Sequence, residues 1–213
     1  MFFIDSAELK EIELALEWGI VSGVTTNPTL IRKSGREHKD VIKEICNIVK
    51  GPVSAEVISL TSKEMIDEGL RLSEIAQNVV IKLPCTRDGI KAASLLKAHG
   101  CKLNITLCFS AAQAILAASV GADYISPFIG RLDDIGHQGV LLIEEIAQLY
   151  ESKYDTKILA ASIRSVEHVL SSFKLGAHVV TAPMKILDQM FDHPLTHKGL
   201  EIFIRDYEAS QTA

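Results

Sequence analysis

A lysine stands inside an apolar stretch of the chain, VVIKLPCT at residues 79–86. The residues around Lys82 read as a buried β-strand that ends at Pro84, yet lysine is rarely buried without a partner. Apolar neighbours and nearby cations disfavour its ammonium form, which leaves a nucleophilic amine able to form a Schiff base with a carbonyl compound. The protonated imine is an electron sink, so a carbon–carbon bond two atoms away can break if a base removes a hydroxyl proton.

Other chemically useful side chains stand at the ends of other apolar runs. Asp5 and Glu56 are the candidates for the base, and Arg131 and Arg164 offer planar forks for a phosphate. The neutral or aromatic candidates at the same strand ends are Thr26, Asn27, Asn104, Thr106, Ser126, Phe128 and Ser162. Each residue alone has an ordinary explanation, such as a helix cap, a surface ion pair or a lysine that reaches the rim. Together they indicate one site.

Eight short apolar runs alternate with helical patterns along the chain. The runs are FFID, GVTTNP, VSAEVI, VVIKLP, KLNITL, YISPF, KILAAS and HVVTAP. A strand of ~5 residues, a helix of ~11 and two loops of ~4 make a unit of roughly 24 residues, so eight units fit the 213-residue chain. Alternating strands and helices imply a parallel sheet. The pattern predicts a (β/α)8 TIM barrel whose site lies at the carboxyl ends of the strands, with a doubly wound open sheet as the alternative.

The chain reads as one domain over residues 1–213, because no Gly/Pro/Ser-rich linker divides it. Residues 194–209 form a further amphipathic helix, which we expect to pack on the barrel or on a neighbouring subunit. Helix entry signals agree with the pattern: Ser6, Thr61, Thr86 and Ser110 are expected to cap the helices that follow them, and Asp40 to help position another.

Composition and charge exclude several functions. A net charge of −5 and a pI near 5.8 indicate no excess of basic residues of the kind that binds nucleic acid or an anionic membrane. The uncharged stretch 103–122 is interrupted by polar side chains, so we expect no membrane span. No targeting segment is visible and the four cysteines form no CxxC pair, so we expect reduced thiols and a cytoplasmic protein. No His or Cys cluster lies at the strand ends, and we expect no metal and no other cofactor.

Five motifs in order resemble the small transaldolase family and its sister fructose-6-phosphate aldolases. They are GVTTNP, VVIKLP, NITLCFSAAQA, ISPFIGRLDDIG and ILAAS, and the resemblance runs from Phe2 to the C-terminal helix. It implies that Lys82 is the Schiff-base lysine and Asp5 the acid/base for the C4 hydroxyl. Glu56 and Thr106 then hold the catalytic water. The implied ligands of the dihydroxyacetone hydroxyls are Asn27, Asn104 and Ser162. The implied phosphate ligands are Arg131 and Arg164, with Ser126 beside them.

The resemblance also implies an activity. Aldolase members tend to carry Gln where this chain has Glu56 and Tyr where it has Phe128, so a transaldolase is expected, moving a dihydroxyacetone unit between sugar phosphates in the non-oxidative pentose phosphate pathway. The alternatives are an aldolase that releases free dihydroxyacetone and a non-catalytic barrel that binds phosphosugars. By resemblance the protein is a homo-decamer of two pentameric rings, with its C-terminal helix reaching a neighbour.

Overall fold

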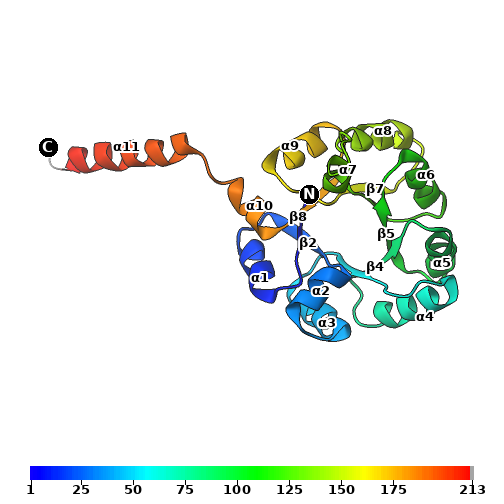
Figure 1. Cartoon of the computed structure of the whole chain (residues 1–213). Helices are drawn as coiled ribbons and strands as arrows, with labels where there is room; N and C mark the ends of the chain where they lie inside the picture. Colours follow the sequence, from blue (N-terminus) through cyan, green and yellow to red (C-terminus); the bar gives the residue numbers. More distant parts are fainter. Residues whose placement is uncertain (212–213) are drawn as a thin grey trace.

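Eight parallel strands close into a barrel in the computed structural model, which describes residues 1–211 (Figure 1). The strands are β1 Phe2–Asp5, β2 Val21–Thr25, β3 Val53–Glu56, β4 Val79–Pro84, β5 Lys102–Cys108, β6 Tyr124–Pro127, β7 Lys157–Ala160 and β8 Val179–Ala182. They follow one another in chain order, and β1 pairs with β8 through Phe2 and Val180 to close the ring. The predicted TIM barrel is therefore confirmed and the open sheet is excluded.

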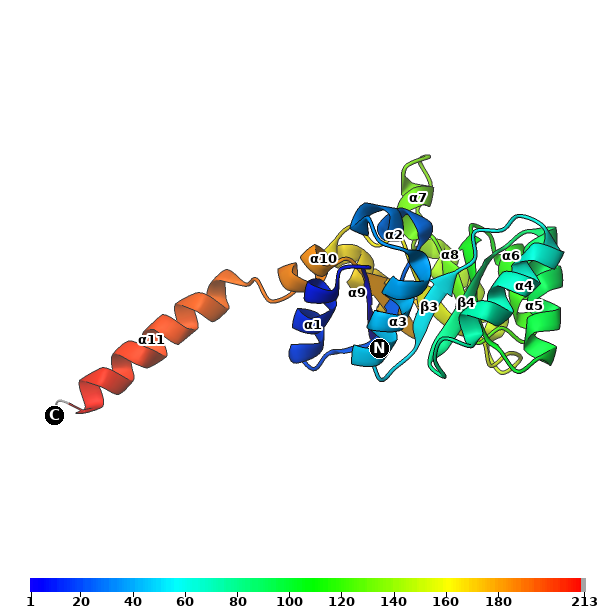
Figure 2. The same cartoon turned by 90° about the horizontal axis from the view of Figure 1, so that it is seen from below.

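Helices follow the strands and form an outer ring around the barrel (Figure 1). The ring contains α1 Leu9–Glu17, α3 His38–Ile48, α4 Ser62–Ser73, α5 Arg87–Ala98, α6 Ala111–Ser119, α8 Leu141–Tyr150, α9 Val166–Lys174 and α10 Met184–Gln189. Two short helices, α2 Pro28–Ser34 and α7 Ile129–Asp133, begin directly after β2 and β6. In Figure 2 both stand at the same end of the barrel, which is the end to which the strands run.

Most of the predicted helix caps are present. The hydroxyls of Thr61, Thr86 and Ser110 each accept a hydrogen bond from the backbone N–H three residues further on. The prediction for Ser6 is wrong, because its Oγ accepts from the N–H of Glu8 and helix α1 begins only after Glu8, which makes no side-chain cap. Ser6 therefore shapes the turn that leads into the helix.

An apolar cluster fills the barrel below the strand ends. It consists of Phe3, Val80, Tyr124, Leu159, Ala161 and Val179. The rings of Phe3 and Tyr124 lie 6.0 Å apart although their strands are not neighbours, so they meet across the interior. Because side chains two apart on a strand share a face, Asp5 and Lys82 project into the same interior one step above Phe3 and Val80. This cluster is a rigid floor beneath the polar residues.

Helix α11, Pro194–Gln211, extends away from the barrel in both views (Figures 1 and 2). None of its residues is buried, and its large apolar side chains are exposed. The expected C-terminal helix is thus present, but it does not fold over its own barrel. No helix within residues 1–211 has the length and apolar character that a membrane crossing requires.

Candidate active site

A pocket of about 120 Å³ opens at the carboxyl ends of the strands. Its lining consists of Asp5, Thr25, Asn27, Lys82, Ser126, Phe128, Arg131, Ala161, Ser162 and Thr181. A larger groove of about 560 Å³ lies at the opposite end, where Lys102, Tyr124 and Lys157 begin their strands. Active sites of TIM barrels sit at the carboxyl ends, and seven of the twelve predicted site residues line the smaller pocket. We therefore take the smaller pocket as the candidate active site.

Lys82 is buried in this site, with an exposed fraction of only 4%. Its Nζ donates to the backbone oxygen of Thr26 at 2.9 Å and lies 3.0 Å from Oε2 of Glu56. Strand register produces this contact, because Glu56 on β3 pairs directly with Lys82 on β4. The apolar neighbours expected from the sequence are present, but the expectation of crowding by cations is wrong: the charged group nearest the ammonium is a carboxylate.

Asp5 is held by a chain of two hydroxyls. Thr25 Oγ1 donates to Asp5 Oδ1 at 2.8 Å, and Thr25 Oγ1 lies 2.6 Å from Thr181 Oγ1. Since Thr25 uses its one proton on Asp5, the hydroxyl of Thr181 must donate to Thr25. Burial raises the pKa of Asp5 above its ordinary value, while nearby Lys82 and the Thr25 hydrogen bond act to lower it. A carboxyl group with a raised pKa is suited to exchange protons near neutral pH.

Asn104 joins two strands deep in the barrel. Its Nδ2 donates to Ser54 Oγ at 3.1 Å, and its Oδ1 accepts from Ser126 Oγ at 2.7 Å. The hydroxyl of Thr26 donates to the backbone oxygen of Ser54 at 2.8 Å. These bonds fix the amide of Asn104 beside Lys82, its register partner on β4. Asn104 and Thr26 thus stand beside the lysine, which lines the pocket.

Thr106 is fully buried, and its Oγ1 has no hydrogen-bond partner among the described residues. It lies two positions after Asn104 on β5 and therefore shares its face. A buried hydroxyl without a partner costs roughly 1–3 kcal/mol. Such a group is suited to hold a water molecule; that Thr106 and Glu56 hold the catalytic water, as the resemblance implies, stays a prediction.

The rim of the pocket combines a cation, an aromatic ring and a strained turn. The guanidinium carbon of Arg131 lies 4.9 Å from the centre of the Phe128 ring. Ser162 has a left-handed backbone with φ of 58°, a conformation that non-glycine residues adopt at a cost and that is common at functional sites. Asn27 caps α2 through Oδ1, which accepts from Leu30 N at 3.0 Å, so its amide NH2 is not used by that cap.

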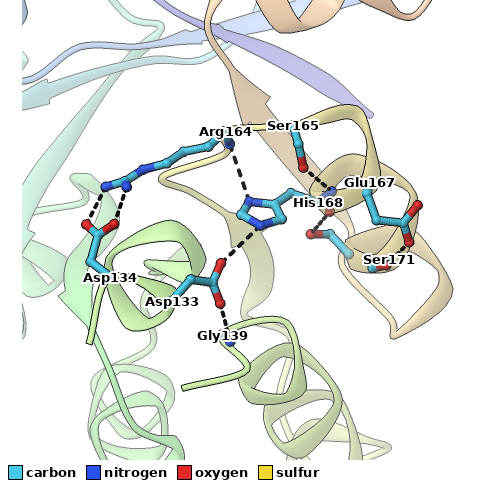
Figure 3. A network of polar contacts seen from close by, with 9 residues as sticks. Asp133, Asp134, Gly139, Arg164, Ser165, Glu167, His168 and Ser171 are labelled. Atoms are coloured by element: carbon cyan, nitrogen blue, oxygen red, sulfur yellow. Dashed lines mark hydrogen bonds and ion pairs between the residues drawn. The ribbon is translucent and has the colours of Figure 1, made fainter. Parts of the chain in front are cut away.

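Arg164 is one of five predicted site residues that lie outside the pocket lining; the others are Thr26, Glu56, Asn104 and Thr106. Its guanidinium forms a two-bonded ion pair with Asp134, with Nη2 2.7 Å from Oδ2 and Nη1 against Oδ1 (Figure 3). Both side chains are half exposed. In this structure the guanidinium of Arg164 is thus paired with the carboxylate that follows helix α7, and the binding of one phosphate by Arg131 and Arg164 together stays a prediction.

Sequence reasoning also missed participants. From the sequence, neither Thr25 nor Thr181 is assigned a role. The signal for Thr181 was available: HVVTAP places a hydroxyl two positions after Val179, the same spacing that separates Lys82 from Val80. Asp134 was overlooked because an acidic residue in a short helix looks like ordinary surface.

The closed (β/α)8 barrel carries a buried lysine, two carboxyl groups and an arginine around one pocket, at the end of the barrel where TIM-barrel enzymes have their active sites. The family model described as Transaldolase/Fructose-6-phosphate aldolase matches residues 2–212. The chain belongs to this enzyme family.

Relatives from distant organisms agree with the family match. The chain is 55% identical over 208 residues to a probable transaldolase of Caldicellulosiruptor saccharolyticus, covering 97% of this chain and 96% of the relative. It is 52% identical to a probable transaldolase of Aquifex aeolicus, with the same shares covered. A probable transaldolase of Methanococcus vannielii is 53% identical over 98% of this chain and 97% of its own.

Proposed function

We propose that the protein is a transaldolase that moves a dihydroxyacetone unit from sedoheptulose 7-phosphate or fructose 6-phosphate to glyceraldehyde 3-phosphate or erythrose 4-phosphate, in the non-oxidative pentose phosphate pathway. One observation carries the proposal: the Nζ of buried Lys82 lies 3.0 Å from Glu56 in a pocket that also contains Asp5. A nucleophilic amine, a proton acceptor for it and a second carboxyl group are what Schiff-base cleavage of a ketose requires. The family and the names of the relatives support the same reaction.

Formation of the Schiff base uses Lys82, Glu56 and Thr106. The ammonium first passes a proton to Glu56, whose Oε2 is 3.0 Å away. The free amine attacks the C2 carbonyl of the ketose, and the resulting carbinolamine loses its hydroxyl as water to give the iminium. In this proposal Glu56 returns a proton to the departing hydroxyl, and the unpartnered hydroxyl of Thr106 helps to hold the water.

Cleavage then uses Asp5. The carboxylate takes the proton of the C4 hydroxyl, the C3–C4 bond breaks, and its electron pair passes to the iminium to form an enamine on Lys82. The aldose phosphate leaves. An acceptor aldehyde reverses these steps: the enamine carbon attacks the aldehyde carbon, and Asp5 returns its proton to the new alkoxide. The raised pKa of Asp5 supports both directions, because it makes the carboxylate a stronger base than an ordinary aspartate while the protonated group can still return the proton.

The remaining site residues bind the substrate in this proposal. Asn27, Asn104 and Ser162 contact the hydroxyls of the dihydroxyacetone unit, with Ser126 holding Asn104 in place. Arg131 lines the pocket and supplies a planar cation for the phosphate. Arg164 supplies a second one from the rim. The partners are therefore small sugar phosphates, and the reaction as proposed needs no cofactor and takes place in the cytoplasm.

A fructose-6-phosphate aldolase is the second candidate, since the family includes both activities. The two differ in what happens to the enamine: hydrolysis releases free dihydroxyacetone, whereas transfer needs an acceptor. Phe128 has no hydroxyl to position or polarise water near the reacting carbons, and this favours transfer.

The deciding experiment has two parts. Glyceraldehyde 3-phosphate formed from fructose 6-phosphate is measured with and without erythrose 4-phosphate, and we expect formation to depend on the acceptor. Borohydride reduction in the presence of fructose 6-phosphate should leave a stable mass on the peptide that contains Lys82, while Lys82→Ala loses turnover by several powers of ten and still folds. Equal rates with and without acceptor would establish the aldolase, and a label on another lysine would refute the assignment of Lys82.

We further propose that the protein is a homo-oligomer, a decamer of two pentameric rings by resemblance. Helix α11 supports an assembly of several copies. Its exposed apolar side chains are Leu195, Leu200, Phe203, Ile204 and Tyr207. A helix that leaves the barrel with such a face is stabilised when a second copy covers it.

A further inference from the structure

Arg164 is held by an acidic neighbour at the rim of the pocket. Asp134 occupies both terminal nitrogens of the guanidinium in a fork-to-fork pair (Figure 3). This geometry is the one in which arginine binds a phosphate. The carboxylate of Asp134 therefore takes the place that two phosphate oxygens would take.

The side chain of Arg164 passes close to the other arginine of the site. A Cβ placed on Gly130 would lie 2.8 Å from Nε of Arg164, so the side chain of Arg164 crosses directly over the backbone of α7. Gly130 N also donates to the backbone oxygen of Ser162 at 3.0 Å. Since Ser162 and Arg131 both line the pocket, Arg164 stands immediately beside it. A change in the side-chain rotamer of Arg164 is therefore enough to release it from Asp134, and the backbone need not move.

The two consecutive aspartates of this turn have different tasks. Asp133 Oδ1 accepts from Gly139 N at 2.8 Å, and its Oδ2 lies 3.0 Å from Nε2 of His168 (Figure 3). The Nδ1 of His168 accepts from the backbone N of Arg164 at 3.4 Å, so Nε2 of the neutral ring carries the proton and donates to Asp133. Asp133 thus braces the turn.

Asp134 has no such structural task. In the part of the chain that the structure describes, the side-chain hydrogen bonds of Asp134 go to Arg164 alone. The guanidinium also lowers the pKa of Asp134 below its ordinary value, so the carboxylate stays charged wherever the enzyme works.

We propose that Asp134 is an internal competitor for Arg164 that tunes the site toward dianionic phosphate, an inference that rests on the proposed function. An exposed ion pair contributes little net stability, so a phosphate carrying nearly two charges can displace it. A singly charged carboxylate ligand has no such advantage, because Asp134 carries the same charge and is already tethered beside the guanidinium. Asp134 is then a specificity-determining residue. It lowers the affinity of Arg164 for every anion, and a dianionic phosphate displaces it more readily than a singly charged carboxylate does.

The test measures binding of inorganic phosphate by calorimetry at about pH 8, where phosphate is mostly a dianion. Wild type is compared with Asp134→Asn, Arg164→Ala and the double variant. We expect Asp134→Asn to lower the Kd for phosphate about two- to fivefold, the range that an exposed ion pair can account for. Arg164→Ala should weaken binding, and Asp134→Asn should have no effect in the Arg164→Ala background.

Glu167→Gln is the matched control, since it removes the same charge from helix α9, and the side chain of Glu167 accepts a hydrogen bond from Ser171 rather than from Arg164. It should leave the Kd unchanged. An unchanged or higher Kd in Asp134→Asn would overturn the inference and make Asp134 a residue that aligns Arg164. Failure of the proposed function would look different. The wild-type protein would then show no acceptor-dependent transfer, while Asp134→Asn would still lower the Kd for phosphate.

Discussion

At the scale of single residues, the proposed chemistry depends on the few groups that contact each ionisable side chain. Asp5 has one hydroxyl donor, Thr25, and that donor is itself fixed by Thr181. Burial raises the pKa of Asp5, and the charge of Lys82 and the Thr25 hydrogen bond oppose the rise. Of these effects, the hydrogen bond from Thr25 can be removed by a substitution that leaves Lys82 in place.

Thr25→Val tests this balance. The change removes a hydrogen bond to the carboxylate, so the pKa of Asp5 should rise further and the carboxylate should be lost at a higher pH on acidification. A bond to a charged group contributes roughly 1.5–3 kcal/mol and one pH unit corresponds to about 1.4 kcal/mol. The acid limb of kcat/KM against pH should thus move upward by about one pH unit. Thr26→Val, whose hydroxyl bonds Ser54 instead, should leave the limb in place. An upward shift of equal size there would contradict the role of Thr25.

Phe128→Tyr tests the choice between transfer and release. The ring of Phe128 lies at the pocket beside Arg131, so a hydroxyl on it would add a donor near the reacting carbons. We expect free dihydroxyacetone formation without acceptor to rise by roughly a hundredfold, the lower end of what a positioned proton donor contributes, while transfer falls. Acceptor-free product from fructose 6-phosphate is the measurement, and an unchanged ratio of release to transfer would show that another residue makes the choice.

At the scale of elements, the packing of the barrel floor requires a glycine, Gly23, in β2. A Cβ on Gly23 would lie 2.6 Å from the ring of Phe3 and 2.8 Å from the backbone oxygen of Pro52. Gly23→Ala should therefore overpack the interior and destabilise the fold by about 1–3 kcal/mol, measured as the urea midpoint or Tm. Gly199→Ala, in α11 where a new Cβ meets nothing, should be neutral or stabilising because alanine favours helices. Equal stability of the two variants would refute the close packing at Gly23.

At the scale of the whole molecule, α11 is a separate element with no buried residue. Phe203, which is 72% exposed in one chain, should be covered by a neighbour if copies assemble through α11. Phe203→Asp should then reduce the mass measured by light scattering, while far-ultraviolet circular dichroism stays near that of wild type. Glu201→Lys, on the same helix but without loss of apolar surface, should keep the mass. A Phe203→Asp protein of unchanged mass would show that α11 does not mediate assembly.

Much of this protein is readable from its sequence. The eight apolar runs, their alternation with helices and the polar residue at each strand end were sufficient to predict the barrel and to gather most of the site, because side-chain periodicity and turn chemistry are local properties. Lys82 stood out for the same reason: a charged residue inside an apolar strand is visible without any knowledge of the fold.

Tertiary structure alone decided which groups touch. Register between β3 and β4 placed Glu56 against Lys82, although the chain between them gives no sign of the pair. Closure of the barrel brought Thr181 from the last strand to Thr25 on the second, and folding of the α7 turn placed Asp134 against Arg164. The physical reason is that hydrogen bonds and ion pairs act over about 3 Å, whereas sequence patterns specify faces and ends of elements but not distances between them.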